Sequence, residues 1–156
     1  MRTTKEEWAL ELARVTAGRS TCLRRAVGCV LLNARGHVLA TGYNGVAAGL
    51  PHCNEVRVVD GEPGYPHACP GALAPSGTRL DACHAIHAEQ NALLQCRDAY
   101  AIEACVVTVS PCVTCTKLLL NTSCQTIIFA EEYAHNAEAA RLWRAAGRAW
   151  RQSCAV

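Results

Sequence analysis

Two short stretches of the sequence contain residues whose types and spacing could hold a metal ion and move protons. His87 and Glu89 lie near the start of HAIHAEQNALLQC, which has the apolar spacing of an amphipathic helix. Cys112 and Cys115 lie in SPCVTC and form the only C-x-x-C pair among eleven cysteines. His87 and the two cysteines would supply three zinc ligands and leave a fourth tetrahedral position for water, which is the arrangement of a catalytic zinc site. Glu89 would then lie beside that water as a proton carrier.

The SPCVTC stretch also places its cysteines where thiolates are favoured. Ser110 is a good N-cap and Pro111 suits the first position of a helix, so we expect a helix to begin there. Cys112 and Cys115 would then lie on one face of the first turns, where the helix dipole and the free amide hydrogens lower thiol pKa values. The thiolate is the form in which cysteine binds Zn²⁺.

Each of these pieces also has a simpler explanation. A histidine at a helix start is usually a capping or core residue, and a glutamate in a first turn usually serves the helix dipole. A C-x-x-C pair can be redox-active, but a redox pair would leave His87 and Glu89 without a role. Together, H-A-E opening one helix and P-C-x-x-C opening a later one match the signature of zinc nucleobase deaminases.

The apolar pattern predicts the elements that must position these residues. We expect helices at 5–17, 84–99, 111–121 and 136–146, and strands at 27–32, 38–43, 104–109, 125–130 and about 148–153. A hairpin followed by alternating helices and strands indicates an α/β fold. We predict a three-layer α/β/α sandwich with a mixed sheet of about five strands, of which the later strands are parallel.

Bulk properties indicate one folded domain over residues 1–156. Hydrophobic residues make up 51% and charged residues 18%, which excludes a disordered chain. We see neither an apolar run of membrane-spanning length nor the apolar core of a signal peptide, so we expect a cytoplasmic protein without a membrane partner. A net charge of +2 without a concentrated basic block argues against binding to duplex nucleic acid. A loop insertion at about 46–83 is rich in proline, glycine and cysteine, and a bound metal would keep it ordered.

The order of several motifs resembles one enzyme family. STCLRRAVG, ATGYNG, GLPHC, PSG, IHAEQNALLQ, SPCVTC and EEY follow one another as in the deoxycytidylate (dCMP) deaminases of the cytidine deaminase superfamily. The resemblance runs from about residue 5 to 146 and implies a cytidine deaminase-like fold. It also implies zinc-dependent hydrolysis of dCMP to dUMP and ammonia, which supplies dUMP for thymidylate synthesis. Glu89 would carry protons to N3 of cytosine and to the departing amino group.

The same resemblance suggests where the nucleotide would bind. Asn44 in GYNG would hydrogen-bond the sugar hydroxyl, and a plain glycine-flanked turn is the alternative. Ser20, Arg24 and Arg25 are candidate donors to the 5′-phosphate, because guanidinium groups suit phosphate oxygens geometrically. Tyr133 in EEY would close over the site. Solvent exposure of the arginines and ordinary packing of Tyr133 are the alternatives.

Related dCMP deaminases often hold a second, structural zinc ion in the region before H-A-E. The resemblance therefore implies a second site with the candidate ligands Cys22, Cys53, Cys69 and Cys83, and with His52, His67 and His84 as substitutes. Four ligands would order the long insertion, and buried free thiols are the alternative. Many relatives are homo-oligomers regulated by dCTP and dTTP, which the resemblance implies here as well. Leu142 and Trp143 in the last helix would form an interface or pack on the sheet.

Two other functions stay open at this point. A deaminase of cytidine, of a modified dCMP or of adenosine in transfer RNA would share the zinc motifs. Deaminases of transfer RNA, free bases or nucleosides typically lack the long cysteine-bearing insertion, and an RNA enzyme would carry a stronger basic surface. The other option is a non-catalytic zinc module closed by a fourth ligand such as Cys83. Glu89 argues against that module, because a structural site gives its carboxyl group no task.

Overall fold

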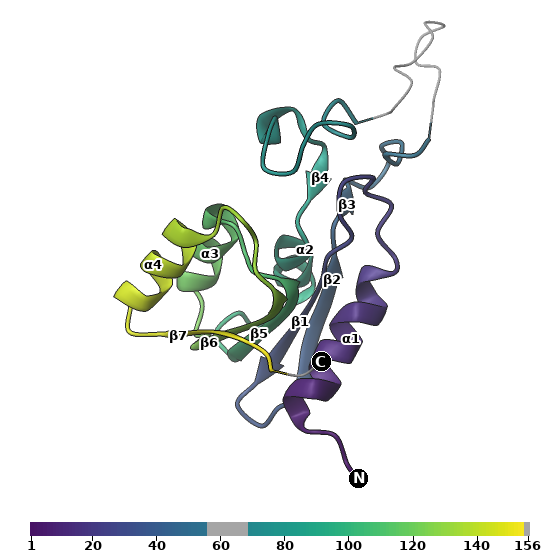
Figure 1. Cartoon of the computed structure of the whole chain (residues 1–156). Helices are drawn as coiled ribbons and strands as arrows, with labels where there is room; N and C mark the ends of the chain where they lie inside the picture. Colours follow the sequence, from purple (N-terminus) through teal and green to yellow (C-terminus); the bar gives the residue numbers. More distant parts are fainter. Residues whose placement is uncertain (56–68, 155–156) are drawn as a thin grey trace, which may run out of the picture.

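The computed structural model describes residues 1–55 and 69–154, which form a five-stranded sheet with helices on both faces (Figure 1). The helices are α1 (Lys5–Ala17), α2 (Ala88–Gln95), α3 (Val113–Leu120) and α4 (Ala137–Ala145), with a short 3₁₀ helix, η1, at Leu80–Ala82. The strands of the main sheet are β1 (Gly28–Asn33), β2 (Val38–Tyr43), β5 (Ile102–Val109), β6 (Thr126–Glu131) and β7 (Ala149–Gln152). A separate pair consists of β3 (Gly45–Val46) and β4 (Ala85–Ile86).

The main sheet is mixed, as predicted. Its strand order is β2-β1-β5-β6-β7, and β1 is antiparallel to both β2 and β5, whereas β5, β6 and β7 run parallel. Helix α1 packs on one face, and α2, α3 and α4 cover the other (Figure 1). The expected three-layer α/β/α sandwich is therefore confirmed. None of the helices in the described residues combines the length and the apolar character needed to cross a membrane.

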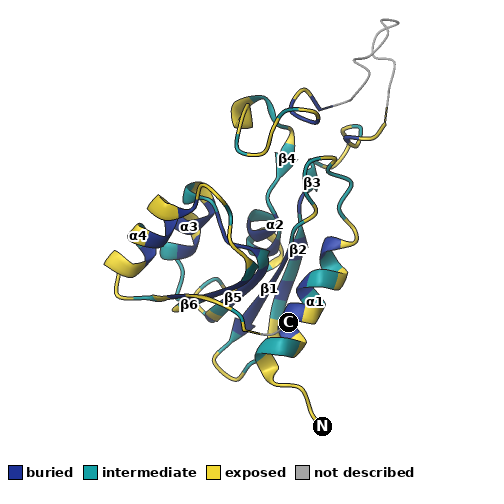
Figure 2. Ribbon diagram, in the orientation of Figure 1, coloured by how far each residue is buried: buried dark blue, intermediate teal, exposed yellow. Residues whose placement is uncertain are grey.

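The buried residues, dark blue in Figure 2, are concentrated on the strands of the main sheet and on the helices that pack on it. On one face, Leu10 of α1 packs in a cluster with Val30 of β1. On the other face, the larger cluster includes Trp143 of α4, which is fully buried. The indole Nε1 of Trp143 donates to the carbonyl oxygen of Ala149 at 2.9 Å. The side chain of Trp143 thus packs on its own sheet and does not form part of an exposed interface.

The helix expected at 84–99 is shorter at both ends. It begins at Ala88 and ends at Gln95, because the two residues before His87 form β4 and pair with β3. Strands of two residues have no periodic signal in a sequence, so this pair could not be expected. The pairing joins the two ends of the insertion, since β3 precedes it and β4 follows it.

The helix expected at 111–121 also begins later, at Val113. Its N-cap is Cys112 in place of the expected Ser110. The Ser110 hydroxyl instead accepts a hydrogen bond from the backbone N–H of Tyr133 at 2.7 Å. Ser110 thus joins the end of β5 to the loop after β6, and the correction moves Cys112 to the boundary of the helix.

Two glycines let helices approach the sheet closely from opposite faces. A Cβ at Gly42 in β2 would lie 2.2 Å from the carbonyl oxygen of Ala88 and 2.4 Å from the nitrogen of Ala92, both in α2. A Cβ at Gly28 in β1 would lie 1.9 Å from the carbonyl oxygen of Ala13 in α1. Only glycine allows a backbone to come this close to a strand. Gly42 therefore sets the distance between the sheet and the first turn of α2.

Candidate active site

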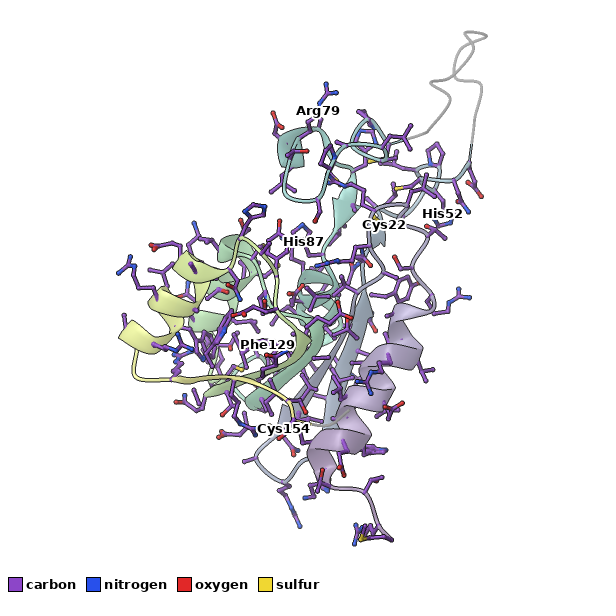
Figure 3. The ribbon with its side chains drawn as sticks, in the orientation of Figure 1. Cys22, His52, Arg79, His87, Phe129 and Cys154 are labelled. Atoms are coloured by element: carbon purple, nitrogen blue, oxygen red, sulfur yellow. The ribbon has the colours of Figure 1, made fainter. Side chains whose placement is uncertain are left out.

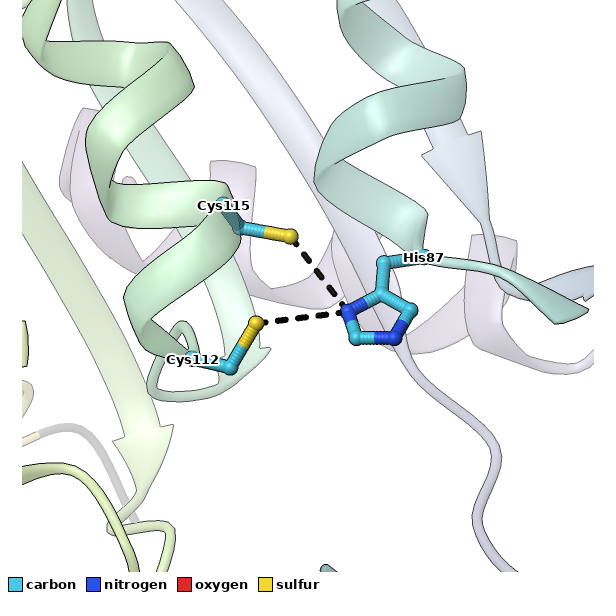
Figure 4. Close-up of side chains that lie close together, drawn as sticks. All are labelled: His87, Cys112 and Cys115. Atoms are coloured by element: carbon cyan, nitrogen blue, oxygen red, sulfur yellow. Dashed lines mark hydrogen bonds between the residues drawn. The ribbon is translucent and has the colours of Figure 1, made fainter. Parts of the chain in front are cut away.

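His87, Cys112 and Cys115 meet where α2 and α3 begin (Figure 4). His87 is the N-cap of α2, Cys112 is the N-cap of α3, and Cys115 follows in the first turn of α3. The backbone N–H of His87 donates to Oε1 of Gln90 at 2.8 Å, which fixes the start of α2. Nδ1 of His87 lies 3.5 Å from Sγ of Cys112 and 3.4 Å from Sγ of Cys115. The three predicted ligands are therefore brought together.

The three donor atoms have the spacing that a zinc ion requires. Within the described residues, they form the only set of three or more His, Cys, Asp or Glu side chains whose ligand atoms all lie within 4.8 Å of one another. Zn–N bonds of about 2.0 Å and Zn–S bonds of about 2.3 Å at tetrahedral angles put nitrogen and sulfur roughly 3.5 Å apart. The observed separations of 3.4 and 3.5 Å match this value. The donor types and their geometry fit zinc.

The surroundings of Cys112 favour its ligating form. A hydrogen bond from the Cys115 thiol, and then one with His87, lower the pKa of Cys112 to about 4 against the effect of burial. The hydrogen bond with Cys112 in turn raises the pKa of His87. Cys112 is therefore a thiolate at neutral pH, and the thiolate is the species that binds Zn²⁺.

Glu89 lies beside these ligands in the first turn of α2. It is 4% exposed, and its carboxyl group is within hydrogen-bonding reach of Cys115. Burial raises the pKa of the Glu89 carboxyl group to about 6. A carboxyl group with a pKa near neutrality can accept and release a proton within one reaction cycle. A buried carboxyl group that can exchange a proton thus lies next to three candidate metal ligands.

A cavity lies next to the ligands and Glu89. Its lining includes His87, Glu89 and Cys112, together with four of the predicted substrate-binding residues, Arg24, Arg25, Asn44 and Tyr133. These residues come from the loop before β1, the end of β2, the starts of α2 and α3, and the loop after β6. A ligand in this cavity would therefore lie against the candidate metal ligands, Glu89 and the predicted substrate-binding residues at the same time.

The Asn44 side chain lines the cavity and also holds the loop before β1. Its Oδ1 accepts a hydrogen bond from the N–H of Val27 at 2.8 Å, and its Nδ2 donates to the carbonyl oxygen of Arg25 at 2.7 Å. The amide nitrogen has a second hydrogen, which is a further donor toward the cavity. Asn44 thus also fixes the backbone of the loop before β1 by hydrogen bonds, which the sequence did not indicate.

The two neighbouring arginines differ in their partners. Nη1 of Arg24 donates to the carbonyl oxygens of Pro75 at 3.3 Å and Thr78 at 2.8 Å. Nη1 of Arg25 is buried and has no hydrogen-bond partner among the described residues. Arg24 is therefore engaged by the protein, whereas Arg25 keeps a buried donor without an acceptor.

The remaining two predicted substrate residues lie in different surroundings. Ser20 is not among the described residues that line the cavity, and its hydroxyl accepts a hydrogen bond from the N–H of Cys22 at 3.2 Å. Tyr133 lines the cavity, and its ring meets the ring of His135 edge-on with centroids 5.4 Å apart. Tyr133 thus lines the cavity, whereas Ser20 is not one of the described residues that line it.

Sequence reasoning did not place the turn-forming part of the insertion in the cavity wall. Ser76, Gly77 and Leu80 belong to the insertion and line the cavity beside the arginines. The Pro-Ser-Gly stretch is a turn signal, and it also contributed to the family resemblance. A turn signal predicts a change of chain direction, but it does not indicate which surface the turn contacts.

The four cysteines expected at a second metal site also gather in the structure. Cys53 and Cys69 are each 1% exposed and pack with Cys83. The Cys69 side chain contacts Cys53 and Cys83 by hydrogen bonding, and its Sγ accepts from the N–H of His84 at 3.3 Å. Burial, and then the neighbouring Cys69 and Cys22, raise the pKa of Cys53 to about 12. The cluster is looser than that of the first site.

The histidines considered as substitute ligands are less informative. Nδ1 of His52 lies 3.0 Å from Oγ1 of Thr21, and Figure 3 shows His52, which is part of the insertion, near Cys22. His84 contributes its backbone N–H to the cluster. His67 lies outside the described residues.

Comparison with known proteins decides the family. The model of the family described as the cytidine and deoxycytidylate deaminase zinc-binding region matches residues 3–131. The chain belongs to this family. All three ligands of the first site and Glu89 lie within the matched region of this deaminase-family chain.

Relatives of the deaminase-family chain include three proteins named deoxycytidylate deaminase. The chain is 36% identical over 130 residues to the one from Mycobacterium phage D29, which covers 81% of the chain and 94% of the phage protein. It is 34% identical over 151 residues to the one from Schizosaccharomyces pombe, which covers 94% of the chain and 43% of the yeast protein. The chain also spans 46% of a relative of the same name from Saccharomyces cerevisiae, so it covers less than half of either yeast protein.

Solved structures agree with the fold. The crystal structure of dCMP deaminase from the cyanophage S-TIM5 in complex with dCMP and dUMP has a TM-score of 0.70 and 22% sequence identity. The comparison covers 98% of this chain and 99% of that chain. The expected cytidine deaminase-like fold is therefore confirmed for this family member.

Proposed function

We propose that this chain is a zinc-dependent hydrolase that converts dCMP to dUMP and ammonia, and so supplies dUMP for thymidylate synthesis. The observation that carries the proposal is a set of three ligands, His87, Cys112 and Cys115, beside the buried carboxyl group of Glu89. Three protein ligands leave a coordination position for a reactant, whereas a structural site uses four. The relatives named deoxycytidylate deaminase support dCMP as the substrate.

The residues of the site divide the chemistry between them. His87, Cys112 and Cys115 would hold a zinc ion, which when bound lowers the pKa of water and supplies hydroxide near neutral pH. Glu89 takes the proton of the attacking water and delivers it to N3 of cytosine, which makes C4 electrophilic. The oxygen of that water forms a bond to C4. Glu89 then takes the remaining proton from this oxygen and passes it to the amino nitrogen as the bond from C4 to that nitrogen breaks, so that C4 becomes a carbonyl carbon and ammonia leaves. The pKa of about 6 suits both transfers.

The nucleotide would be oriented by the rest of the cavity. The second Nδ2 hydrogen of Asn44 is the donor for the sugar hydroxyl, and Tyr133 closes the cavity beside it. The 5′-phosphate meets Arg25, whose buried Nη1 has no acceptor among the described residues. Ser20 and Arg24, which the sequence also suggested for the phosphate, have protein partners instead.

A substrate panel tests the proposed reaction. Zinc-loaded protein would be incubated with dCMP, CMP, dCTP, deoxycytidine, cytosine and adenosine, and turnover would be followed by ultraviolet absorbance and ammonia release. We expect the highest kcat/KM with dCMP. A preference for adenosine or free cytosine would contradict dCMP as the substrate. A zinc-loaded protein that turns over none of the six compounds would contradict the proposal that the chain is an enzyme.

The cluster in the insertion would bind a second, structural zinc ion. Its ligands would be Cys22, Cys53, Cys69 and Cys83, and the contacts among these thiols support the assignment. We expect metal analysis to give two zinc ions per chain in the wild type and one after Cys53→Ser. A wild-type ratio of one zinc per chain would leave the cluster as buried thiols.

The chain would also form a homo-oligomer in the cytoplasm, with dCTP and dTTP as effectors. Family resemblance supports this assignment. Light scattering would give the oligomeric state, and dCMP titrations with and without each triphosphate would show regulation as a change in the midpoint of the saturation curve. A monomer with an unchanged curve would contradict both parts.

A further inference from the structure

The turn at residues 75–78 is held at both of its ends by one side chain. The N–H and the hydroxyl of Thr78 donate to the carbonyl oxygen of Pro75 at 3.1 and 2.6 Å, which closes the turn. Nη1 of Arg24 then donates to the carbonyl oxygens of Pro75 at 3.3 Å and Thr78 at 2.8 Å. Arg24 lies more than fifty residues earlier in the sequence, so this contact fixes the turn to the loop before β1.

The same turn packs directly on the loop after β6. Gly77 has a φ of +80°, and a Cβ built on it would lie 2.6 Å from Cδ2 of His135 and 2.8 Å from Oη of Tyr133. A side chain at this position would push the turn away from both rings. Ser76, Gly77 and Tyr133 all line the cavity. The turn and the tyrosine therefore form adjoining parts of one wall.

Arg24 and Arg25 differ in their hydrogen-bond partners in this arrangement. Both line the cavity, but the Arg24 guanidinium is bonded to two carbonyl oxygens of the turn. Arg25 instead has a buried Nη1 without an acceptor among the residues that the structure describes. A buried donor without a partner is costly, and an anionic ligand in the cavity would remove that cost.

We infer that Arg24 is a positioning residue, which holds the 75–78 turn as a wall of the nucleotide pocket, and that Arg25 alone binds the anionic group. This inference rests on the proposed function and divides between two residues a role that the sequence assigned to both. It also makes the 75–78 turn part of the specificity of the site. The turn limits the position of the whole nucleotide, so its loss should weaken binding with or without a phosphate.

Kinetics with two substrates separate these roles. We would measure kcat and KM for dCMP and deoxycytidine in Arg24→Gln, Arg24→Lys, Arg25→Gln and the exposed-site control Arg97→Gln. Arg25→Gln should lower kcat/KM for dCMP by about 10-fold to 100-fold and reduce the preference for dCMP over deoxycytidine. Arg24→Gln should raise KM for both substrates by a similar factor and change kcat less, so that the preference is kept. In Arg24→Lys, KM should return part of the way to the wild-type value.

A collapse of the dCMP preference in Arg24→Gln, as in Arg25→Gln, would show that Arg24 binds phosphate and would overturn the inference. A double variant adds a second criterion. Adding Gly77→Val to Arg24→Gln should lower kcat/KM for dCMP little further than Arg24→Gln does alone, because both changes release the same turn. Fully additive losses would show that Arg24 does not act through Gly77.

Trypsin gives a readout that does not depend on activity. Arg79 is exposed and directly follows the turn, so release of the turn should expose the bond after it. We expect cleavage after Arg79 to be about fivefold faster or more in Arg24→Gln, and unchanged in Arg97→Gln. An unchanged cleavage rate in Arg24→Gln would show that Arg24 does not hold the 75–78 turn. Faster cleavage with no dCMP turnover by the wild type would refute the proposed function and the pocket-wall role, while the contact would stand.

Discussion

The variant Gly42→Ala should disable the active site without changing any residue in it. The new Cβ would lie 2.2 Å from the carbonyl oxygen of Ala88 and 2.4 Å from the nitrogen of Ala92, whereas ordinary contacts begin at 3.4 Å. Both obstacles are backbone atoms, so no side-chain rotation relieves the overlap. The start of α2 must therefore move by about 1 Å relative to the sheet. His87 and Glu89 flank Ala88 and would move with it.

This displacement has a size that can be compared with known effects. A misplacement of about 1 Å at a catalytic group costs roughly a hundredfold in rate, so kcat should fall by about that factor. Overpacking costs about 1–3 kcal/mol of folding free energy, and a chain of this length loses about 2–4 °C in Tm for each kcal/mol. Gly42→Ala should therefore lower Tm by about 3–10 °C while the protein stays folded at 25 °C.

Gly28→Ala is the matched control. Its Cβ would meet the carbonyl oxygen of Ala13 at 1.9 Å, but Ala13 belongs to α1 on the opposite face of the sheet. We expect a similar loss of Tm and a much smaller loss of kcat. The assay is dCMP turnover at 25 °C, with Tm from circular dichroism and zinc content from metal analysis. Equal losses of kcat in the two variants, or a folded Gly42→Ala with more than half of the wild-type kcat, would refute the reasoning.

Three further variants test other parts of the structure. Glu89→Gln should retain its zinc and lower kcat by about 10²-fold to 10⁴-fold, and substantial turnover at full zinc content would contradict its role as proton carrier. Cys112→Ser should reduce the zinc content by one ion per chain and abolish turnover while leaving the far-ultraviolet spectrum intact, and an unchanged zinc content would remove Cys112 from the ligands. Trp143→Phe removes the hydrogen bond to Ala149, so urea unfolding should show a loss of about 1–3 kcal/mol, and an unchanged midpoint would show that this bond contributes nothing net.

The grouping of the three candidate metal ligands with Glu89 could be predicted because the signal is local. His87 and Glu89 are two residues apart, and Cys112 and Cys115 are three apart, so each pair lies within one helical turn. The spacing on its own restricts where their side chains can point. The sheet then only has to bring two helix starts together, and the alternation of strands and helices predicted that arrangement.

The roles of the two arginines could not be predicted, because their signal is not local. Arg24 and Arg25 are adjacent and chemically identical, and they differ only in which acceptors the fold brings near them. The acceptors of Arg24 belong to Pro75 and Thr78, which lie within the long insertion and more than fifty residues later in the sequence. For the same reason the helix at Ser110 was expected too early. The hydroxyl of Ser110 is occupied by the N–H of Tyr133, which a reading of neighbouring residues cannot reveal.

The pairing of β3 with β4 has a practical consequence. Gly45 lies opposite Ile86 and Val46 lies opposite Ala85, so the chain leaves and re-enters the domain at neighbouring points. Because the two ends of the segment are held together, residues can be added between them without shifting either strand. A transplanted recognition loop would have to keep the 75–78 turn, because Ser76 and Gly77 line the cavity.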